Sequence, residues 1–407
     1  MLKCINPRIR FQEFKSWWKP IKLIDLGLSL GGTAIESEFN PEGKFKVISI
    51  GSYSEESKYK DQGIRAVYSQ KTEKRILDKD DLTMILNDKT STGKIIGRVL
   101  LIDEDNSYVY NQRTQRISLN KNKFVPGFIF QLLNADINRN KIVRSAQGNT
   151  QIYVNWSDIS NLDYLIPESI EEQSAIGSFF RTLDDLLASY KDNLANYQSL
   201  KATMLTKMFP KAGQTVPEIR LDGFEGEWKK DTFEPYLTES RISGDTGLTA
   251  KKITVKLWGK GVIEKEEKYA GSSNTQYFIR KAGQFIYSKL DFQNQAFGII
   301  PNELDGYQST LDLPTFDIQN IDPKFLLEYV MRREFYEYQG LIANGSRKAK
   351  RIHPENFLDM PVRIPSLEEQ QAIGTYFSNL DNLINSYQEK ISQLETLKKK
   401  LLQDMFI

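Results

Sequence analysis

The residues best suited to chemistry are cations and small amides gathered in two basic segments. Residues 106–157 contain seven basic residues against one acidic residue, and residues 331–353 contain six against two. Each segment includes a small polar loop, at 145–151 and at 343–351. Arginine and lysine bind phosphates, while Gln, Asn and Arg can contact base edges through paired hydrogen bonds. Both loops are therefore predicted to contact DNA, the alternative being an ordinary solvated loop.

The individual contacts are predicted from position and side-chain type. In the two loops they are Arg144, Ser145, Gln147, Asn149, Gln151, Asn344, Ser346, Arg347, Lys348, Lys350 and Arg351. Three further candidates are Arg113 and Arg116 in the run NQRTQR, and Lys289 in YSKLDFQNQ. Alternation along a strand could equally place these three side chains on a solvated sheet face.

The sequence offers little material for catalysis. The one cysteine, Cys4, and the one histidine, His353, cannot supply the clustered ligands of a zinc site. A Ser/His/Asp triad would depend on His353 alone. The sequence contains no GxxxxGK[ST] phosphate loop, no GxGxxG turn after a strand and no Asn-Pro-Pro-Tyr segment of the amino-methyltransferase type. We therefore expect no catalytic residue, no metal site and no cofactor in this chain.

Length and composition predict the class of protein. A chain of 407 residues suits two or three domains, each with a core of its own. Hydrophobic residues make up 40% of the sequence, and no apolar run approaches the roughly 18 residues that cross a bilayer. The N-terminus has no continuous apolar stretch of signal-peptide type. These features predict a folded, cytoplasmic protein with no membrane partner.

The positioning elements occur twice, because the chain contains an internal repeat. An opening block from Pro7 to Lys19 recurs 210 positions later, from Pro217 to Lys229. A second block, EEQSAIGSFFRTLDDLLASY from Glu171, recurs as EEQQAIGTYFSNLDNLINSY at an offset of 197. The segments between the blocks show little similarity. Similar frames around dissimilar middles indicate two different recognition surfaces, although duplication and drift is the simpler alternative.

The second repeated block predicts a long helix in each copy. Apolar residues alternate at steps of four and three, which is the heptad pattern of a helix that pairs with another helix. The predicted seam consists of Ile176, Phe180, Leu183, Leu187 and Tyr190 in the first copy and Ile373, Phe377, Leu380, Ile384 and Tyr387 in the second. A lysine interrupts both seams at the same position, Lys201 and Lys398. We expect these lysines to set the register of the pair.

The ends of the two helices are also marked. Each helix is predicted to begin with a capping box, Ser169 with Glu172 and Ser366 with Glu369, and to run for about 38 residues, or roughly 57 Å. Antiparallel pairing of the two helices would relate the halves by a pseudo-two-fold axis. The alternative is that each helix packs only on its own domain.

These features together predict a mixed α+β chain. Two α/β domains with similar frames are separated by two long helices that form an antiparallel coiled coil. The expected boundaries are 1–19 for a lead-in, 20–165 for the first variable domain, 166–210 for the central helix, 211–228 for a linker with a second lead-in, 229–363 for the second variable domain and 364–407 for the distal helix.

The order of these elements resembles a known family. The helix openings IPESIEEQSAIG and IPSLEEQQAIG, with a RLDGFEGEW segment before the second variable domain, are similar to the specificity subunits of type I restriction-modification systems. The resemblance spans essentially the whole chain. The first opening, NPRIRFQEFKSWW, departs from the pattern because it lacks the glycine that stands at Gly223.

The resemblance implies a function and a set of partners. Each variable region would be a target recognition domain that reads one half of a split site in double-stranded DNA, and the helices would set the gap. Two modification subunits would bind S-adenosylmethionine and methylate adenine, and restriction subunits would add ATP- and Mg-dependent translocation and cleavage. The chain itself would be non-catalytic. Its rivals are an enzyme that cuts or modifies DNA unaided and a coiled-coil scaffold whose variable domains bind proteins.

Overall fold

The computed structural model describes residues 6–266, 271–342 and 351–406. The chain divides into two compact units. The first unit consists of Met1–Lys191 with Glu389–Ile407, and the second is Asp192–Gln388. Each unit therefore contains one variable domain, the first part of the helix that follows it and the last part of the other long helix.

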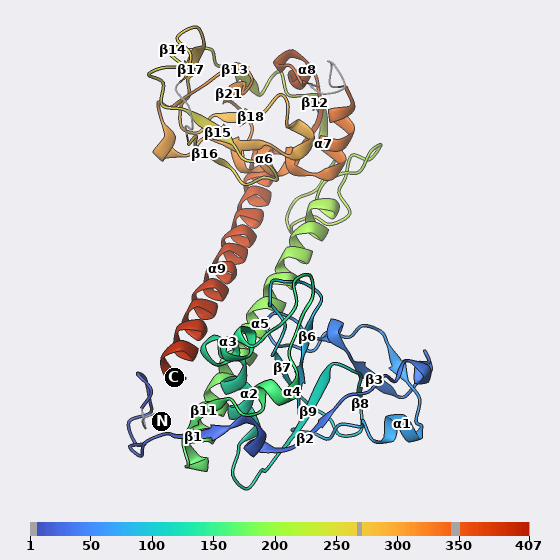
Figure 1. Ribbon diagram of the computed structural model, residues 1–407. Helices are drawn as coiled ribbons and strands as arrows, with labels where there is room; N and C mark the ends of the chain where they lie inside the picture. Colours follow the sequence, from blue (N-terminus) through green and yellow to red (C-terminus); the bar gives the residue numbers. More distant parts are fainter. Residues whose placement is uncertain (1–5, 267–270, 343–350, 407) are drawn as a thin grey trace. The chain divides into compact units, whose positions relative to one another are not determined.

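The first unit is built on a four-stranded antiparallel sheet with strand order β2-β9-β5-β7 (Figure 1). Its strands are β1 (Lys19–Lys22), β2 (Gly27–Gly31), β3 (Phe45–Ile48), β4 (Arg65–Ala66), β5 (Leu82–Ile85), β6 (Asn87–Asp88), β7 (Val99–Leu101), β8 (Tyr108–Tyr110), β9 (Thr114–Leu119), β10 (Ile152–Tyr153) and β11 (Asp163–Ile166). Its short helices are α1 (Gln70–Glu73), α2 (Pro126–Asn134), α3 (Asp136–Arg144) and α4 (Trp156–Ile159). Leu82, Met84 and Ile117 point from the sheet into a core shared with α2 and the long helices.

The second unit has a four-stranded sheet of order β13-β21-β18-β19, also antiparallel throughout. Its strands are β12 (Lys229–Thr232), β13 (Leu237–Glu239), β14 (Ser243–Thr246), β15 (Ile253–Val255), β16 (Val262–Glu264), β17 (Gln276–Ile279), β18 (Phe285–Tyr287), β19 (Phe297–Ile299), β20 (Gln308–Ser309), β21 (Thr315–Ile318) and β22 (Pro361–Ile364). Its short helices are α6 (Pro323–Met331), α7 (Arg333–Gln339) and α8 (Pro354–Leu358).

The four-stranded sheets of the two variable domains share one strand order in spite of their different sequences. In both sheets the first strand along the chain pairs with the last, and the last pairs with the second. Two short helices follow each sheet, α2 and α3 in one unit, α6 and α7 in the other, and their starts differ by the offset of the repeated helix block. The domains therefore share their main sheet and the two helices after it, whereas their smaller sheets differ: the first unit has β4-β3-β8 with a parallel β3–β8 pair, and the second has the antiparallel β14-β17-β20.

The long helices are α5 (Ile170–Lys207, 38 residues) and α9 (Leu367–Met405, 39 residues), which confirms the predicted length. One half of each predicted capping box is confirmed, because the Ser169 and Ser366 hydroxyls accept hydrogen bonds from the backbone N–H groups of Glu172 (3.2 Å) and Glu369 (3.3 Å). The other half is wrong. The carboxylates of both glutamates turn away from the backbone to bind an arginine and a tryptophan, as described below.

Within each unit, a stretch of one long helix packs on a stretch of the other. In the first unit, Phe180 of α5 stacks on Phe406 just after α9, and Lys191 of α5 pairs with Glu395. The residue numbers rise along one helix as they fall along the other, so these stretches run antiparallel. The second unit repeats the contacts between α9 and the end of α5, with Phe377 stacked on Phe209 and Tyr387 beside Tyr197. The predicted seam residues are all buried or half-buried.

Neither helix resembles a membrane span. No helix in the described part of the chain is both long and apolar enough to cross a bilayer.

Candidate nucleic-acid interface

In the first unit, the predicted DNA contacts meet at the connection between β5 and β7. The backbone N–H of Leu86 donates to the carbonyl of Arg113 (2.9 Å), and the N–H of Val154 donates to the carbonyl of Leu86 (2.9 Å). Strands β6 and β10 pair next to these bonds, with Asp88 opposite Ile152. The exposed Arg113 and the loop before β10 therefore lie on either side of the same connection, although they are distant in the sequence.

The loop before β10 is a hairpin that presents three amide side chains. Gln147 and Tyr153 exchange two backbone hydrogen bonds of 2.9 Å, which close the loop. Gly148 lies at φ +103°, and a Cβ there would meet the Gln151 carbonyl oxygen at 2.1 Å, so the turn requires glycine. Gln147, Asn149 and Gln151 are exposed. No hydrogen bond to another described residue engages the side-chain amides of Asn149 and Gln151, so both are available to a ligand.

The remaining loop candidates differ in whether their side chains already have a hydrogen-bond partner within the protein. Arg144 is exposed at the end of α3. The Ser145 hydroxyl, by contrast, already donates to the Lys141 carbonyl at 3.2 Å. Arg113 has a backbone φ of +66°, which is uncommon for a side chain of this size and holds it at the tip between β8 and β9.

Lys89 and Tyr153 belong to the same surface, and the sequence analysis missed both. Asp88 orders the turn that carries Lys89, because its carboxylate accepts from the backbone of Thr90 (2.9 Å) and Ile95 (3.0 Å). Burial works to raise the pKa of Asp88, but these hydrogen bonds outweigh it and hold the pKa below its ordinary value. Tyr153 closes the predicted loop through its bonds with Gln147, whereas the pairing of β6 with β10, which no local pattern marks, brings the segment that carries Lys89 to the loop.

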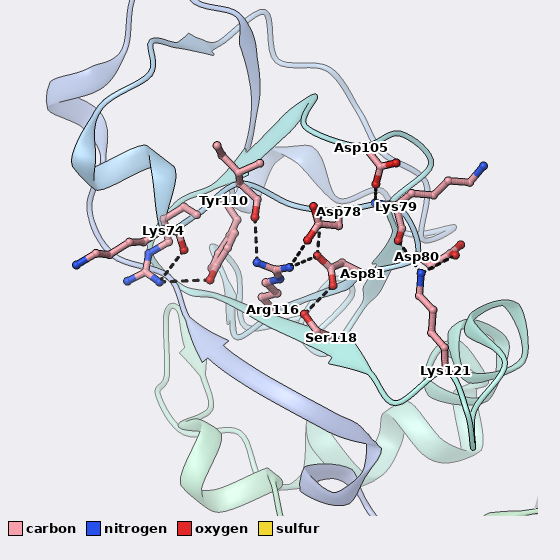
Figure 2. Close-up of polar contacts among 12 residues, drawn as sticks. Lys74, Asp78, Lys79, Asp80, Asp81, Asp105, Tyr110, Arg116, Ser118 and Lys121 are labelled. Carbon is pink, nitrogen blue, oxygen red and sulfur yellow. Dashed lines mark hydrogen bonds and ion pairs between the residues drawn. The ribbon is translucent and has the colours of Figure 1, made fainter.

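Arg116 lies in a different environment, an ion-pair network on the face of β9 (Figure 2). Its guanidinium contacts Asp78 (2.9 Å) and Asp81 (2.7 Å) and donates to the Ile76 carbonyl (3.0 Å). Asp81 also accepts from Ser118 (2.7 Å). Two carboxylates thus neutralise this arginine, whose side chain is 19% exposed. A DNA contact by Arg116 stays a prediction, and it would require the guanidinium to leave both partners.

The second unit has its candidate residues at the equivalent connection, between β18 and β19. Lys289 donates its backbone N–H to the Asp312 carbonyl (3.0 Å), and its own carbonyl accepts from Ile352 (3.1 Å). Arg351 lies 3.6 Å from the Asp312 carboxylate. Burial lowers the pKa of the half-buried Lys289, although Asp312 works in the opposite direction. Asn344, Ser346, Arg347, Lys348 and Lys350 lie outside the described residues.

The hydrogen bonds define which positions correspond. Lys289 makes the two backbone bonds that Leu86 makes in the first unit, so Asp312 stands where the first unit has Arg113. The two units therefore present chemically different side chains at one place in a common framework.

The framework that holds these surfaces explains the repeated EEQ sequence. The buried Glu172 accepts two hydrogen bonds from Arg10, at 2.6 and 2.7 Å, and one from the indole of Trp18 at 3.1 Å. Glu369 accepts the equivalent bonds from Arg220, at 2.8 and 2.7 Å, and from Trp228 at 3.3 Å. Two-pronged pairing with arginine compensates a buried carboxylate. The glutamate thereby fixes each lead-in segment to the start of a long helix.

The neighbouring glutamine fixes the variable domain to the same helix. In the first unit, the Gln173 side chain accepts from Val125 (2.9 Å), the residue before α2, and donates to Pro167 (3.0 Å). In the second, the Gln370 side chain accepts from Asp322 (2.9 Å), the residue before α6. These bonds tie the variable domain to the helix turn that begins α5 or α9.

The described residues contain no cluster of three or more His, Cys, Asp or Glu side chains that could hold a metal ion. Most residues of the candidate interface are amides and cations, and Ser145, Tyr153 and Asp312 lie among them. Such groups bind nucleic acid by hydrogen bonds and phosphate contacts.

Comparisons with known proteins agree with this arrangement. The model of the type I restriction modification DNA specificity domain matches twice, over residues 15–196 and 227–396. The structure of the type I restriction-modification S subunit from M. genitalium is 15% identical, with a TM-score of 0.63 and 99% of each chain covered. A structure described under complex assembly and conformational transition of the type I R-M system is 14% identical, with a TM-score of 0.54 and 95% and 96% coverage. No curated protein sequence matches.

The structural likenesses establish the fold at these identities, and the domain model establishes the family. With both of its halves matched, the chain belongs to the family of type I restriction-modification specificity subunits, and it carries two copies of the DNA specificity domain.

Proposed function

We propose that this chain is the DNA-reading subunit of a type I restriction-modification complex. Each variable domain reads one half of a bipartite site in double-stranded DNA. The observation that carries the proposal is the pair of equivalent connections, β5–β7 and β18–β19, which hold different side chains on sheets of the same strand order. A repeated framework with divergent contacts is what recognition of two different half-sites requires, because base edges are told apart by the side chains that face them.

The long helices are proposed to form an antiparallel coiled coil that sets the spacer between the half-sites. The support is that the same lysine–aspartate pair between the two helices occurs in both units, at positions related by the offset of the helix repeat. Lys201 pairs with Asp381 at 2.6 Å in the second unit, and Lys398 pairs with Asp184 at 2.5 Å in the first. Exchanging the two copies converts one pair into the other, as a pseudo-two-fold axis demands. At 1.5 Å per residue, each helix is about 57 Å long. This length exceeds the roughly 34 Å repeat of B-DNA, so the helix pair is long enough to separate two half-sites by a helical turn.

Catalysis is assigned to partner subunits. In this proposal two modification subunits dock on the helices and carry S-adenosylmethionine, and restriction subunits carry ATP and Mg. One of the two similar structures concerns the assembly of a type I R-M complex, which is consistent with such partners. The chain's own role is to position them on DNA.

The test is to co-express this chain with a modification subunit from its own host that carries an adenine methyltransferase motif, and to map methylated adenines by long-read sequencing. The proposal predicts co-purification and one split motif with a fixed gap. A continuous motif would contradict the two-domain reading. Absence of both co-purification and methylation would favour the protein-binding scaffold.

A further inference from the structure

The second unit carries an exposed tryptophan in an unusual backbone conformation. Trp258 lies in the turn between β15 and β16, within the sequence KLWGKG at 256–261. It is 58% exposed, and its backbone φ is +61°. A positive φ is a true outlier for a residue of this size, and exposure of a large aromatic ring forgoes the free energy of burial. Both features cost stability, and residues that carry such a cost are found most often at binding sites.

The turn is held rigidly against the body of the unit. The backbone N–H of Trp258 donates to the Asn294 carbonyl (2.8 Å), and that of Gly259 donates to the Gln295 carbonyl (3.0 Å). Lys256 donates to the carbonyl of Gly261 (2.8 Å), which closes the turn at its base. These bonds fix the backbone of the turn, while the indole ring of Trp258 remains exposed to solvent. The position of the ring is therefore set by an ordered backbone.

The charges around the ring are positive. Lys256 and Lys260 flank Trp258 and are exposed, and neither has an ion-pair partner among the described residues. Leu257, the residue before Trp258, is 38% exposed. An apolar wedge between two free ammonium groups matches the surface of a nucleic-acid groove, where phosphates border stacked bases and sugars.

The turn also joins the candidate interface. Asn294 and Gln295, which hold it, belong to the connection between β18 and β19, and Lys289 lies at the other end of that same connection. The turn and the predicted contact Lys289 are thus attached to one short segment. We propose that the turn 256–261 is a second DNA-contacting element of this unit, in which Trp258 enters a groove against bases and sugars while Lys256 and Lys260 contact the flanking phosphates.

This inference rests on the proposed function, and the experiment separates the two. The probe is a fluorescently labelled 40-base-pair duplex that contains the split motif found by methylation mapping, bound to the assembly that co-purifies with this chain. Trp258→Ala should weaken binding about tenfold, since one aromatic stacking contact contributes about 1–3 kcal/mol. Lys256→Gln with Lys260→Gln should reduce the slope of log affinity against log salt by about 2.

Trp17→Ala is the matched control, because Trp17 is 59% exposed but lies in the lead-in of the first unit. It should leave the affinity unchanged. Unchanged affinity in Trp258→Ala would overturn the inference while leaving the proposed function intact. Loss of co-purification in Trp258→Ala would also overturn it, in favour of a protein contact. Failure of the unaltered assembly to bind the duplex would count against the proposed function itself.

A second measurement does not depend on any variant. Substituting 5-iodouracil for thymine in the duplex allows photochemical cross-linking to aromatic side chains in contact with DNA. The inference predicts a cross-linked peptide containing Trp258. Efficient cross-linking to other peptides of the second unit, with none to this one, would contradict it.

Discussion

The lysine in the helix seam of the second unit offers a quantitative test of the framework. Lys201 binds Asp381 at 2.6 Å and Glu328 at 3.2 Å. Glu328 lies on α6, so this lysine joins the recognition domain to both long helices. Burial raises the pKa of Glu328, whereas Lys201 works to lower it. Lys201→Met would leave the buried Glu328 carboxylate without its cation.

The expected loss follows from the burial of the two carboxylates. Removing one partner of a buried pair costs about 3–5 kcal/mol, and we take the lower end because Asp381 is 41% exposed. Lys201→Met should therefore destabilise α6 by about 3 kcal/mol at pH 7.5. The first unit supplies the control. There Gln131 occupies the position of Glu328 and donates to Asp184 at 3.0 Å, so Lys398→Met leaves no buried carboxylate unpaired and should cost about 1 kcal/mol.

The pH dependence has a definite sign. A carboxyl group whose folded pKa exceeds its unfolded pKa destabilises the fold increasingly as pH rises above the unfolded value. Loss of Lys201 raises the folded pKa of Glu328 further, so the deficit should shrink as pH falls from 7.5 to 5. Adding Glu328→Gln to Lys201→Met removes the charge and should restore most of the stability at pH 7.5.

Hydrogen exchange measured by mass spectrometry over α6 and α2 reports each unit separately. Equal losses in Lys201→Met and Lys398→Met would refute the assignment of the cost to Glu328. A loss that is independent of pH, or that Glu328→Gln does not relieve, would refute it as well.

Three other substitutions test the framework. Phe406→Ala should destabilise the first unit by about 3–5 kcal/mol and leave the second unchanged, because its buried ring packs in the first unit alone; unit-resolved hydrogen exchange would show this. Gly374→Ala places a Cβ 2.7 Å from Asp322 Oδ1 and should cost about 1–3 kcal/mol in thermal unfolding, a penalty that an undisturbed melting temperature would disprove. Arg116→Gln should lower the stability of the first unit because the buried Asp81 loses its cation, which unit-resolved hydrogen exchange would show; unchanged exchange in that unit would contradict the structural role of the ion pair.

The long helices were largely predictable from the sequence. Their heptad pattern and proline-serine openings are local signals, and both helices have the expected length. The role of Glu172 was not predictable, because a capping box describes only neighbours along the chain. Its carboxylate finds Arg10 and Trp18, which are distant in sequence, and a two-pronged ion pair with arginine is stronger than the expected bond to the backbone.

The shared strand order of the two four-stranded sheets could not be predicted from the sequences. Sheet order depends on pairing between segments that are far apart, and alternating apolar residues indicate strands without naming their partners. The two domains form four-stranded sheets of the same order from different side chains, so similarity of residues does not reveal the shared order. One sign of the correspondence is visible in the sequence: Pro126 and Pro323, at the starts of α2 and α6, are separated by the same offset as the repeated helix block.

The candidate interface was predictable only in part. Polar loop residues such as Asn149 and Gln151 stand out by type and position. In the structure their side-chain amides are exposed and make no hydrogen bond to a described residue. Arg116 has the same residue type as Arg113 and lies three positions away, but Asp78 and Asp81 engage it. Sequence patterns treat the two arginines alike, because the carboxylates that pair with Arg116 are distant from it in the sequence.

The central claim is that each unit reads its own half of the DNA site. It is tested most directly by mapping adenine methylation for two variants beside the unaltered chain, all co-expressed with the methyltransferase. One variant combines Asn149→Ala with Gln151→Ala, and the other combines Lys289→Ala with Arg351→Ala. The account predicts that each variant relaxes the base preference in one half of the motif, a different half in each case, with the gap unchanged. Relaxation of the same half by both variants, or of both halves by either one, would contradict it.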